Sequence, residues 1–164
     1  MQHTGTISAL AFSANRTLLY SASWDRTFKV WSLYTMQCQK SFTAHMDSIN
    51  AMLVGPSDGL LYTGSADKSI KVWCPWPTST KGERRKYKHS MVVALQREQG
   101  AAINTMVESG DGSLLYSAGS NRQVFVWRRS SPSWPHKAAL VAQLSRLQEK
   151  LQGHTRAVLC LAFL

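Results

Sequence analysis

Two stretches of twelve residues decide the fold: Tyr20-Ser-Ala-Ser-Trp-Asp-Arg-Thr-Phe-Lys-Val-Trp31 and Tyr62-Thr-Gly-Ser-Ala-Asp-Lys-Ser-Ile-Lys-Val-Trp73. Each ends in a run that alternates apolar and polar residues, which is typical of a β-strand. Both belong to a longer unit, because three segments align without gaps from an apolar residue to a tryptophan. These segments are residues 7–31, 49–73 and 103–127. The chain is therefore predicted to be a repeat array.

The spacing of the units indicates the kind of repeat. Trp31 and Trp73 are 42 residues apart, within the period of about 40 to 45 residues of four-stranded propeller blades. Trp73 and Trp127 are 54 residues apart, which we interpret as the same unit with an insertion. The predicted repeats are residues 3–44, 45–98, 99–152 and an incomplete 153–164, with insertions at about 74–90 and 128–147.

Short apolar stretches separated by tight turns predict four strands in each complete unit. The first turns of the second and third units hold Asp58-Gly59 and Asp111-Gly112, a pairing that favours hairpins because glycine accepts positive φ. The fourth unit adds one strand that ends at Leu164. The predicted fold class is all-β.

The two twelve-residue stretches, together with the pair Gly153-His154, resemble WD40 repeats, and the narrower resemblance is to plant WD40 proteins of the Jingubang type. The resemblance covers nearly the whole chain. It implies a partial β-propeller of about three four-stranded blades plus the first strand of a fourth. It also implies that a His, a Ser or Thr, an Asp and a Trp of each blade form one hydrogen-bonded network, here called the tetrad. Two tetrads would be complete: His3, Ser21, Asp25 and Trp31, and His45, Thr63, Asp67 and Trp73.

The third repeat departs from this pattern. Gln99 stands where the His belongs and Asn121 where the Asp belongs, while Ser117 and Trp127 are kept. Neutral side chains can still form hydrogen bonds, but they lose the charge-assisted part, which makes a bond about twice as strong. We therefore expect a weaker third tetrad.

The residues of a tetrad also have the types of a Ser-His-Asp hydrolase triad. A structural role for these residues is favoured over a catalytic one. The same residue types recur once in each repeat, whereas an active site has no reason to recur with the repeat. The sequence contains no Gly-x-Ser-x-Gly elbow, phosphate-binding glycine loop or His-Glu-x-x-His pair. The three cysteines are far apart, and His89 and His136 are expected to be solvated loop residues. We predict no catalysis, no cofactor and no metal site.

The net charge of +10 is concentrated in two segments, with +4 in residues 74–99 and +5 in residues 128–164. In a propeller, both insertions lie between the third and fourth strands, on the face opposite the Asp turns. One hypothesis is a shared basic surface for nucleic acid or another anionic ligand. Its candidate residues are Arg84, Arg85, Lys86, Lys88, Arg128, Arg129 and Lys137. The alternative, a pair of solvated loops, is favoured.

The opposite face carries the turns that contain the tetrad Asp residues, and WD40 proteins commonly bind partners there. Trp and Arg dominate interface energetics, so we predict that the chain is a noncatalytic protein–protein interaction scaffold with a docking site on this face. The candidate docking residues are Trp24, Arg26, Lys68 and Arg122. The alternative for Trp24, packing against the neighbouring blade, stays open.

The chain is short for a closed ring, since propellers have about 4 to 8 blades. Two copies would supply 26 predicted strands rather than the 28 of a seven-bladed ring, so missing blades explain the length better than simple dimerisation. Either self-association or missing blades would be needed to close the propeller. We expect a cytoplasmic or nuclear location, because no secretory signal and no apolar run of about 18 residues is visible.

Overall fold

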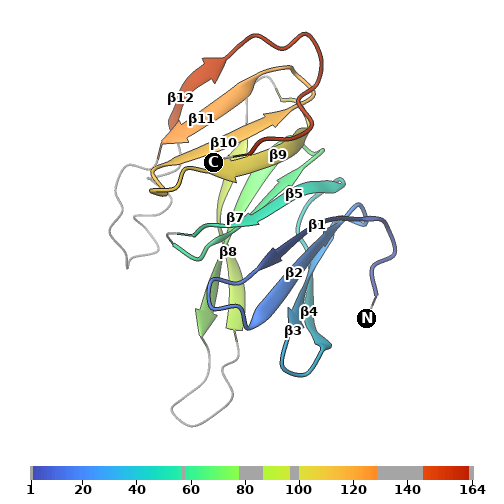
Figure 1. Ribbon diagram of the computed structural model, residues 1–164. Coiled ribbons are helices and arrows are strands. Elements are labelled where there is room, and N and C mark those ends of the chain that lie inside the picture. The colour runs from blue at the N-terminus through green and yellow to red at the C-terminus, as the bar shows by residue number, and fades with distance from the viewer. Residues whose placement is uncertain (1, 57, 78–86, 97–99, 129–145, 163–164) are drawn as a thin grey trace.

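The computed structural model describes residues 2–56, 58–77, 87–96, 100–128 and 146–162 (Figure 1). Within these ranges the chain forms twelve strands and no helix, so the predicted all-β class is confirmed. Consequently, none of the described segments is a helix that could cross a membrane.

The strands form three antiparallel sheets of four, and each sheet keeps the order of the sequence. Blade 1 contains β1 (Ile7–Phe12), β2 (Leu18–Ser23), β3 (Thr27–Ser32) and β4 (Gln37–Thr43). Blade 2 contains β5 (Ile49–Val54), β6 (Leu61–Ser65), β7 (Ser69–Pro77) and β8 (Tyr87–Gln96). Blade 3 contains β9 (Ile103–Glu108), β10 (Leu114–Gly119), β11 (Val124–Arg128) and β12 (Arg146–Leu151).

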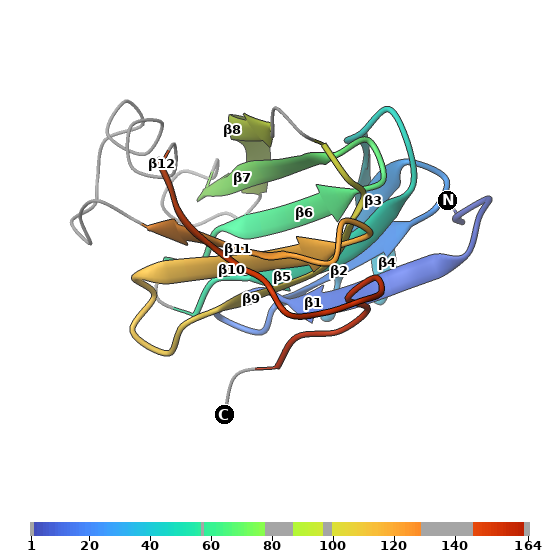
Figure 2. The ribbon, with the colours of Figure 1, turned by 90° about the horizontal axis from the view of Figure 1, so that it is seen from above.

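The first strands of the blades lie next to one another at the inner edge of the fan, with β5 between β1 and β9 (Figure 2). One hydrogen bond repeats along this edge. Ser8 donates to the carbonyl of Ile49, Asn50 Nδ2 donates to the carbonyl of Ile103 over 3.1 Å, and Asn104 Nδ2 donates to the carbonyl of Val158 over 3.1 Å. Val158 therefore occupies the place that Ile49 and Ile103 occupy in blades 2 and 3.

The bond from Asn104 to Val158 aligns the fourth unit with the first strands of the complete blades. The described residues 153–162 nevertheless form no strand ladder. In the complete blades the first strand pairs with the second. The segment is instead held to blade 3 by single contacts, among them the bond from Val158 N to Gly119 O over 3.1 Å. In this detail the structure differs from the predicted lone strand.

The core lies between the blades. Leu18, Tyr20 and Ala22 of β2 pack against Ile49 and Trp73 of blade 2. The second interface is built in the same way, with Tyr62 of blade 2 against Ile103 and Trp127 of blade 3. Each blade thus covers one face of its neighbour, and β6 of blade 2 is buried on both faces.

The predicted first turns are confirmed. Gly59 and Gly112 have φ values of +66° and +69°, which glycine accepts without the steric cost that a Cβ would bring. Arg16 adopts a φ of +53° in the matching turn of blade 1.

The predicted insertion at residues 74–90 is in large part an extension of a hairpin. β7 continues to Pro77 and β8 starts at Tyr87, with Pro75 opposite His89 in the ladder. The prediction of a loop is therefore wrong for residues 74–77 and 87–90. Blade 3 has its predicted fourth strand before Gly153, in β12, and residues 129–145 of the second insertion fall outside the described residues.

Candidate functional site

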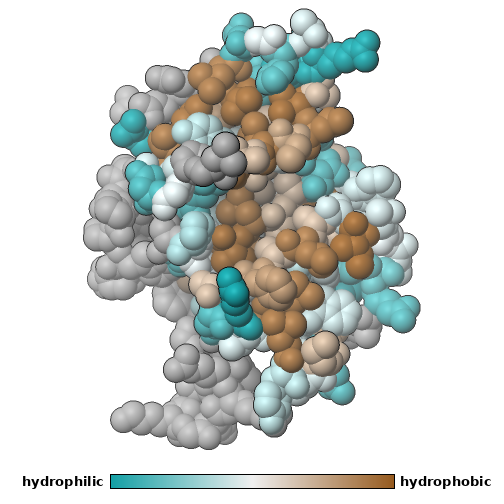
Figure 3. All heavy atoms as spheres, in the orientation of Figure 1, coloured by the Kyte–Doolittle hydropathy of each residue, from teal (hydrophilic) through white to brown (hydrophobic). Residues whose placement is uncertain are grey.

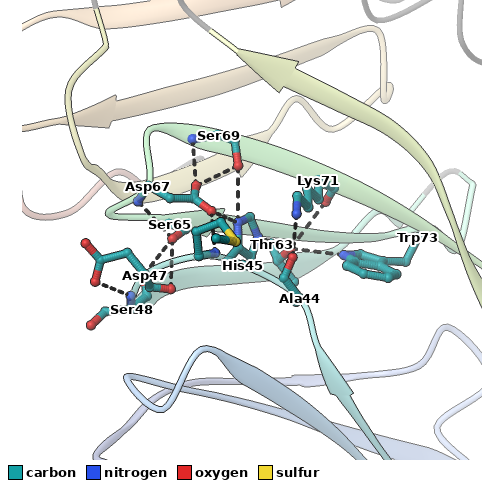
Figure 4. A network of polar contacts seen from close by, with 11 residues as sticks. Ala44, His45, Asp47, Ser48, Thr63, Ser65, Asp67, Ser69, Lys71 and Trp73 are labelled. Atoms are coloured by element: carbon teal, nitrogen blue, oxygen red, sulfur yellow. Dashed lines mark hydrogen bonds and ion pairs between the residues drawn. The ribbon is translucent and has the colours of Figure 1, made fainter.

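The tetrad of blade 2 is assembled from the segment before β5, from strands β6 and β7 and from the turn between them (Figure 4). His45 Nδ1 lies 2.9 Å from Asp67 Oδ2, and His45 Nε2 lies 2.8 Å from Thr63 Oγ1. Trp73 Nε1 donates to the same Thr63 oxygen over 3.0 Å. The four side chains form one continuous chain of hydrogen bonds from the indole to the carboxylate.

The protonation states determine which group donates in each of these hydrogen bonds. Burial lowers the pKa of His45, although the neighbouring Asp67 acts to raise it. Burial raises the pKa of Asp67, but bonds from Ser69, Met46 N and His45 outweigh it and hold the value at about 2. A neutral imidazole beside a carboxylate donates from Nδ1 and accepts at Nε2. The Thr63 hydroxyl therefore donates to His45 and accepts from Trp73.

Blade 1 repeats this geometry. His3 lies 2.8 Å from Asp25 Oδ2 through Nδ1 and 2.8 Å from Ser21 Oγ through Nε2. Trp31 Nε1 donates to Ser21 Oγ over 2.8 Å. Burial acts to raise the pKa of Asp25, but hydrogen bonds from Thr27, His3 and Thr4 N hold it well below its usual range. Ser21 is unlike the nucleophilic serine of a hydrolase triad, because it is buried and its oxygen is already hydrogen-bonded to two side chains.

In blade 3 the structure brings together only part of the network. Trp127 Nε1 donates to Ser117 Oγ over 2.9 Å, as in the other blades. Asn121 Nδ2 lies 3.5 Å from Gln123 Oε1, and Asn121 Oδ1 is buried without a hydrogen-bond partner among the described residues. Gln99 lies outside the described residues, so its place in the network stays a prediction.

The Asp residues sit in turns that present exposed side chains. Trp24 is 55% exposed. Arg26, Lys68 and Arg122 occupy the same position in the three turns, and all three adopt positive φ, at +71°, +74° and +66°. This conformation is uncommon for residues with a Cβ. Each turn is closed by a backbone bond, such as Arg26 N to Ser23 O over 3.2 Å.

Met46 adds an apolar side chain that the sequence interpretation missed. It follows His45 directly, it is 83% exposed, and its backbone N donates to Asp67 Oδ2 over 3.0 Å. Trp24 is close to the same loop, because Ser48 Oγ donates to the Trp24 carbonyl over 3.4 Å. The name turn face is used below for Trp24, Arg26, Met46, Lys68 and Arg122.

Few of the proposed anion-binding residues can be placed. Arg128 ends β11, at the end of the blade opposite the Asn121 turn, and its side chain is exposed. Lys88 belongs to β8. Arg84, Arg85, Lys86, Arg129 and Lys137 fall outside the described residues. The shared basic surface therefore stays a prediction.

The prediction that His89 is a solvated loop residue is wrong. His89 lies on β8 and is 6% exposed, with Nε2 2.9 Å from the Tyr20 hydroxyl of blade 1. Its ring also makes edge contacts with Phe28 and Phe42. Burial, together with the positive charge of Lys40, lowers the pKa of His89 to about 4. His89 is thus a neutral side chain that joins blades 1 and 2.

Two lysines stand at polar positions of the alternating third strands. Lys29 is buried and its Nζ donates to Ser41 Oγ over 2.8 Å. Lys71 Nζ donates to the carbonyl of Ala44 over 2.6 Å. Their recurrence before Val-Trp in both stretches was the available signal. No cluster of three or more His, Cys, Asp or Glu suited to a metal ion occurs in the described part of the chain.

Comparison with known proteins gives one family. The family described as "WD domain, G-beta repeat" matches residues 1–32, 36–74 and 92–128, which together exceed half of the chain. Over 32 residues, the chain is 53% identical to the periodic tryptophan protein 2 homolog of Neurospora crassa and 47% identical to periodic tryptophan protein 2 of Saccharomyces cerevisiae. This stretch is 20% of the chain and only 4% of the length of either relative.

A solved structure, titled "Structure of U3-55K", has the same fold. It superposes on 98% of this chain with a TM-score of 0.71 at 20% sequence identity. The chain spans 43% of the length of that protein.

Proposed function

Because the chain belongs to the WD40 family, we propose that it is a noncatalytic protein–protein interaction scaffold that binds its partner through the turn face. The observation that carries this proposal is the exposure of Trp24 and Met46 on turns that the tetrads hold in place. Exposed aromatic and Arg side chains are the usual anchors of interfaces.

The tetrads contribute by fixing these turns before a partner arrives. Asp25 accepts hydrogen bonds from the backbone N of Thr4 and of Thr27, at 3.0 Å and 2.9 Å. Asp67 does the same for Met46 and Ser69, at 3.0 Å for both. A surface that is already ordered loses less conformational entropy on binding. The tetrad thus has a structural role in this function and no chemical one.

The test uses partner capture from a cell extract, followed by affinity measurements with the purified partner. Trp24→Ala and Arg26→Ala should each weaken binding by about tenfold or more. Tyr34→Ala is the matched control, because Tyr34 is exposed on the β3–β4 turn at the other end of blade 1. Unchanged affinity in both turn-face variants, with intact folding, would exclude this docking site.

The net charge of +10 favours a second candidate, the binding of nucleic acid or another anionic ligand through the basic insertions. Its test is a salt titration with duplex DNA. Each phosphate that the protein neutralises contributes a slope of about −0.9 to the dependence of log K on log salt. Neutral substitutions at Arg84, Arg85 and Lys86 should reduce both affinity and slope, whereas a protein partner of the turn face should be unaffected.

Three further expectations stay predictions. They are the absence of catalysis, the cytoplasmic or nuclear location, and the narrower resemblance to plant Jingubang-type proteins. The two relatives named above are fungal periodic tryptophan proteins.

A further inference from the structure

The three turns between the second and third strands all end in a basic residue. Arg26, Lys68 and Arg122 are exposed, and all three have positive φ, a backbone region that favours glycine because glycine has no Cβ. Local backbone preference therefore does not explain a long basic side chain at these positions. A role of the side chains themselves would explain it.

The basic residues lie along a surface that crosses from blade to blade. The Arg26 carbonyl accepts a hydrogen bond from Ala44 N over 3.0 Å, in the segment before β5 that also holds Met46. The Lys68 side chain lies against Gly100, in the segment before β9. A Cβ on Gly100 would be 2.6 Å from Lys68 Cδ. Each turn thus adjoins the next blade, and the turn face extends from blade 1 to blade 3.

Blades 1 and 2 also carry acidic residues on this surface. Burial acts to raise the pKa values of Asp25 and Asp67, but the hydrogen bonds that both accept hold these values below their usual range. Both side chains are therefore ionised at neutral pH. Asp47, in the segment before β5, is exposed. These carboxylates offset the charges of Arg26 and Lys68.

Blade 3 lacks the corresponding carboxylates. Asn121 stands where the other turns have Asp, and Ala101 stands where the segment before β5 has its exposed aspartate. The described segments 100–102 and 119–123 contain no acidic residue. Arg122 thus has a positive charge that no carboxylate of its own turn offsets.

The apolar residues of the turn face lie at its other end. Trp24 and Met46 are both more than half exposed, and Ser48 Oγ links their loops by donating to the Trp24 carbonyl over 3.4 Å. Figure 3 shows mainly hydrophilic residues on the side of the molecule that carries the N-terminus. The turn face belongs to this side, because His3 bonds to Asp25. The surface is therefore polarised, with apolar anchors on blades 1 and 2 and uncompensated positive charge on blade 3.

We propose that the partner segment recognised by the turn face is an acidic peptide with one large apolar residue, an assignment that rests on the proposed function. The apolar side chain lies on Trp24 and Met46, and carboxylates on one side of it pair with Lys68 and Arg122. A carboxylate can bind the guanidinium group of Arg122 through two parallel hydrogen bonds. A nucleic acid fits this surface less well, because its regularly spaced phosphates would also meet the carboxylates of blades 1 and 2.

The test starts with the selection of short random peptides by phage display on the immobilised full chain. The selected peptides should share a large apolar residue with Asp or Glu residues on one side of it. One of them, labelled with fluorescein, is titrated with the chain beside a counterpart in which Gln and Asn replace every Glu and Asp. The neutral counterpart should bind about tenfold or more weakly, because the charge-assisted hydrogen bonds are lost.

Variants of the chain locate the charge contacts. Arg122→Glu and Lys68→Glu should each weaken binding of the acidic peptide by about tenfold or more, because like charges then face each other. Arg16→Glu is the matched control. Arg16 is also exposed and has a φ of +53°, but it lies in the β1–β2 turn at the opposite end of blade 1. This variant should bind as the wild type does, and thermal melts by circular dichroism establish that each variant is folded.

The outcomes distinguish this assignment from the proposed function. Weaker binding in Trp24→Ala with full binding in Arg122→Glu and Lys68→Glu would keep the docking site and overturn the acidic partner. Full binding in all three variants would overturn both. The acidic partner is also overturned if no peptide or only neutral peptides are selected, if the neutral counterpart binds equally well, or if Arg16→Glu weakens binding equally. Displacement of the peptide by duplex DNA that itself requires Arg122 would favour nucleic acid instead.

Discussion

At the scale of single residues, the hydroxyl of Thr63 has two roles in one tetrad, because it donates to His45 and accepts from Trp73. Thr63 and His45 are both buried. A buried polar group that loses its partner costs about 1–3 kcal/mol. The tetrad is therefore a network in which one oxygen satisfies two other groups.

Replacing this oxygen tests the network. Thr63→Val keeps the shape of the side chain but leaves the indole N–H and the imidazole unsatisfied, so the free energy of unfolding should fall by about 3 kcal/mol. Ser117→Ala is the comparison, because the described contacts of Ser117 Oγ include Trp127 and no imidazole. Urea denaturation should show a smaller loss for Ser117→Ala, and equal losses would contradict the role assigned to the histidine.

His89 predicts a pH dependence of stability. Its pKa is about 4 in the folded chain and near 6.5 without burial, so between these values the unfolded chain binds more protons. Lowering the pH therefore favours unfolding. The contribution of His89 to the free energy of unfolding should be fully present above about pH 6.5 and should fall by about 3 kcal/mol as the pH approaches 4.

The variant His89→Gln isolates this contribution, since glutamine stays neutral throughout. Its urea midpoint should change less than that of the wild type between pH 6.5 and 4. Asp67 loses its stabilising charge only at lower pH, below its ordinary value of 3.8, and both proteins share that effect. Parallel profiles of the two proteins between pH 4 and 6.5 would show that His89 does not titrate on unfolding.

At the scale of structural elements, the Asp turns join β2 to β3, β6 to β7 and β10 to β11 with the same backbone shape. The last residue of each turn has positive φ, yet it is Arg or Lys rather than Gly. A left-handed conformation costs about 1–2 kcal/mol for a residue with a Cβ. These turns place a long basic side chain on the turn face at some expense of stability.

Lys68→Gly should relieve this cost and raise the free energy of unfolding by up to about 1 kcal/mol, as glycine accepts positive φ but loses more entropy on folding. Lys68→Ala removes the same side chain and keeps the Cβ, so it should not stabilise the chain. Urea denaturation distinguishes the two. A glycine variant no more stable than the alanine variant would show that the turn is not strained.

The sequence predicted turns and strands well where their conformation depends on neighbouring residues in the chain. It predicted less well the features that depend on packing between distant residues. The Asp-Gly turns and the alternating third strands follow from φ preferences and from period-two patterning. The burial of Lys29 does not follow from alternation alone, because it depends on a contact within the blade, from Lys29 Nζ to Ser41 Oγ of β4. The place of His89 depends on the length to which β7 and β8 extend, and polar residues with prolines gave no local signal for that extension.

At the scale of the whole molecule, the same interface between neighbouring blades occurs twice within the described residues. Burial of apolar surface is the main stabilising contribution to folding, and both interfaces contribute fully buried aromatic and aliphatic side chains.

The bonds between neighbouring first strands also bear on how the chain folds as it is synthesised. They join residues 41, 53 and 54 positions apart, so each sheet finds its docking surface in the sheet made just before it. The entropy of loop closure grows slowly with length, by about 0.6 kcal/mol for each doubling, so the insertions add little to this cost. Blade 1 can thus be in place on the ribosome before blade 3 has been translated, and growth proceeds from the N-terminus one blade at a time.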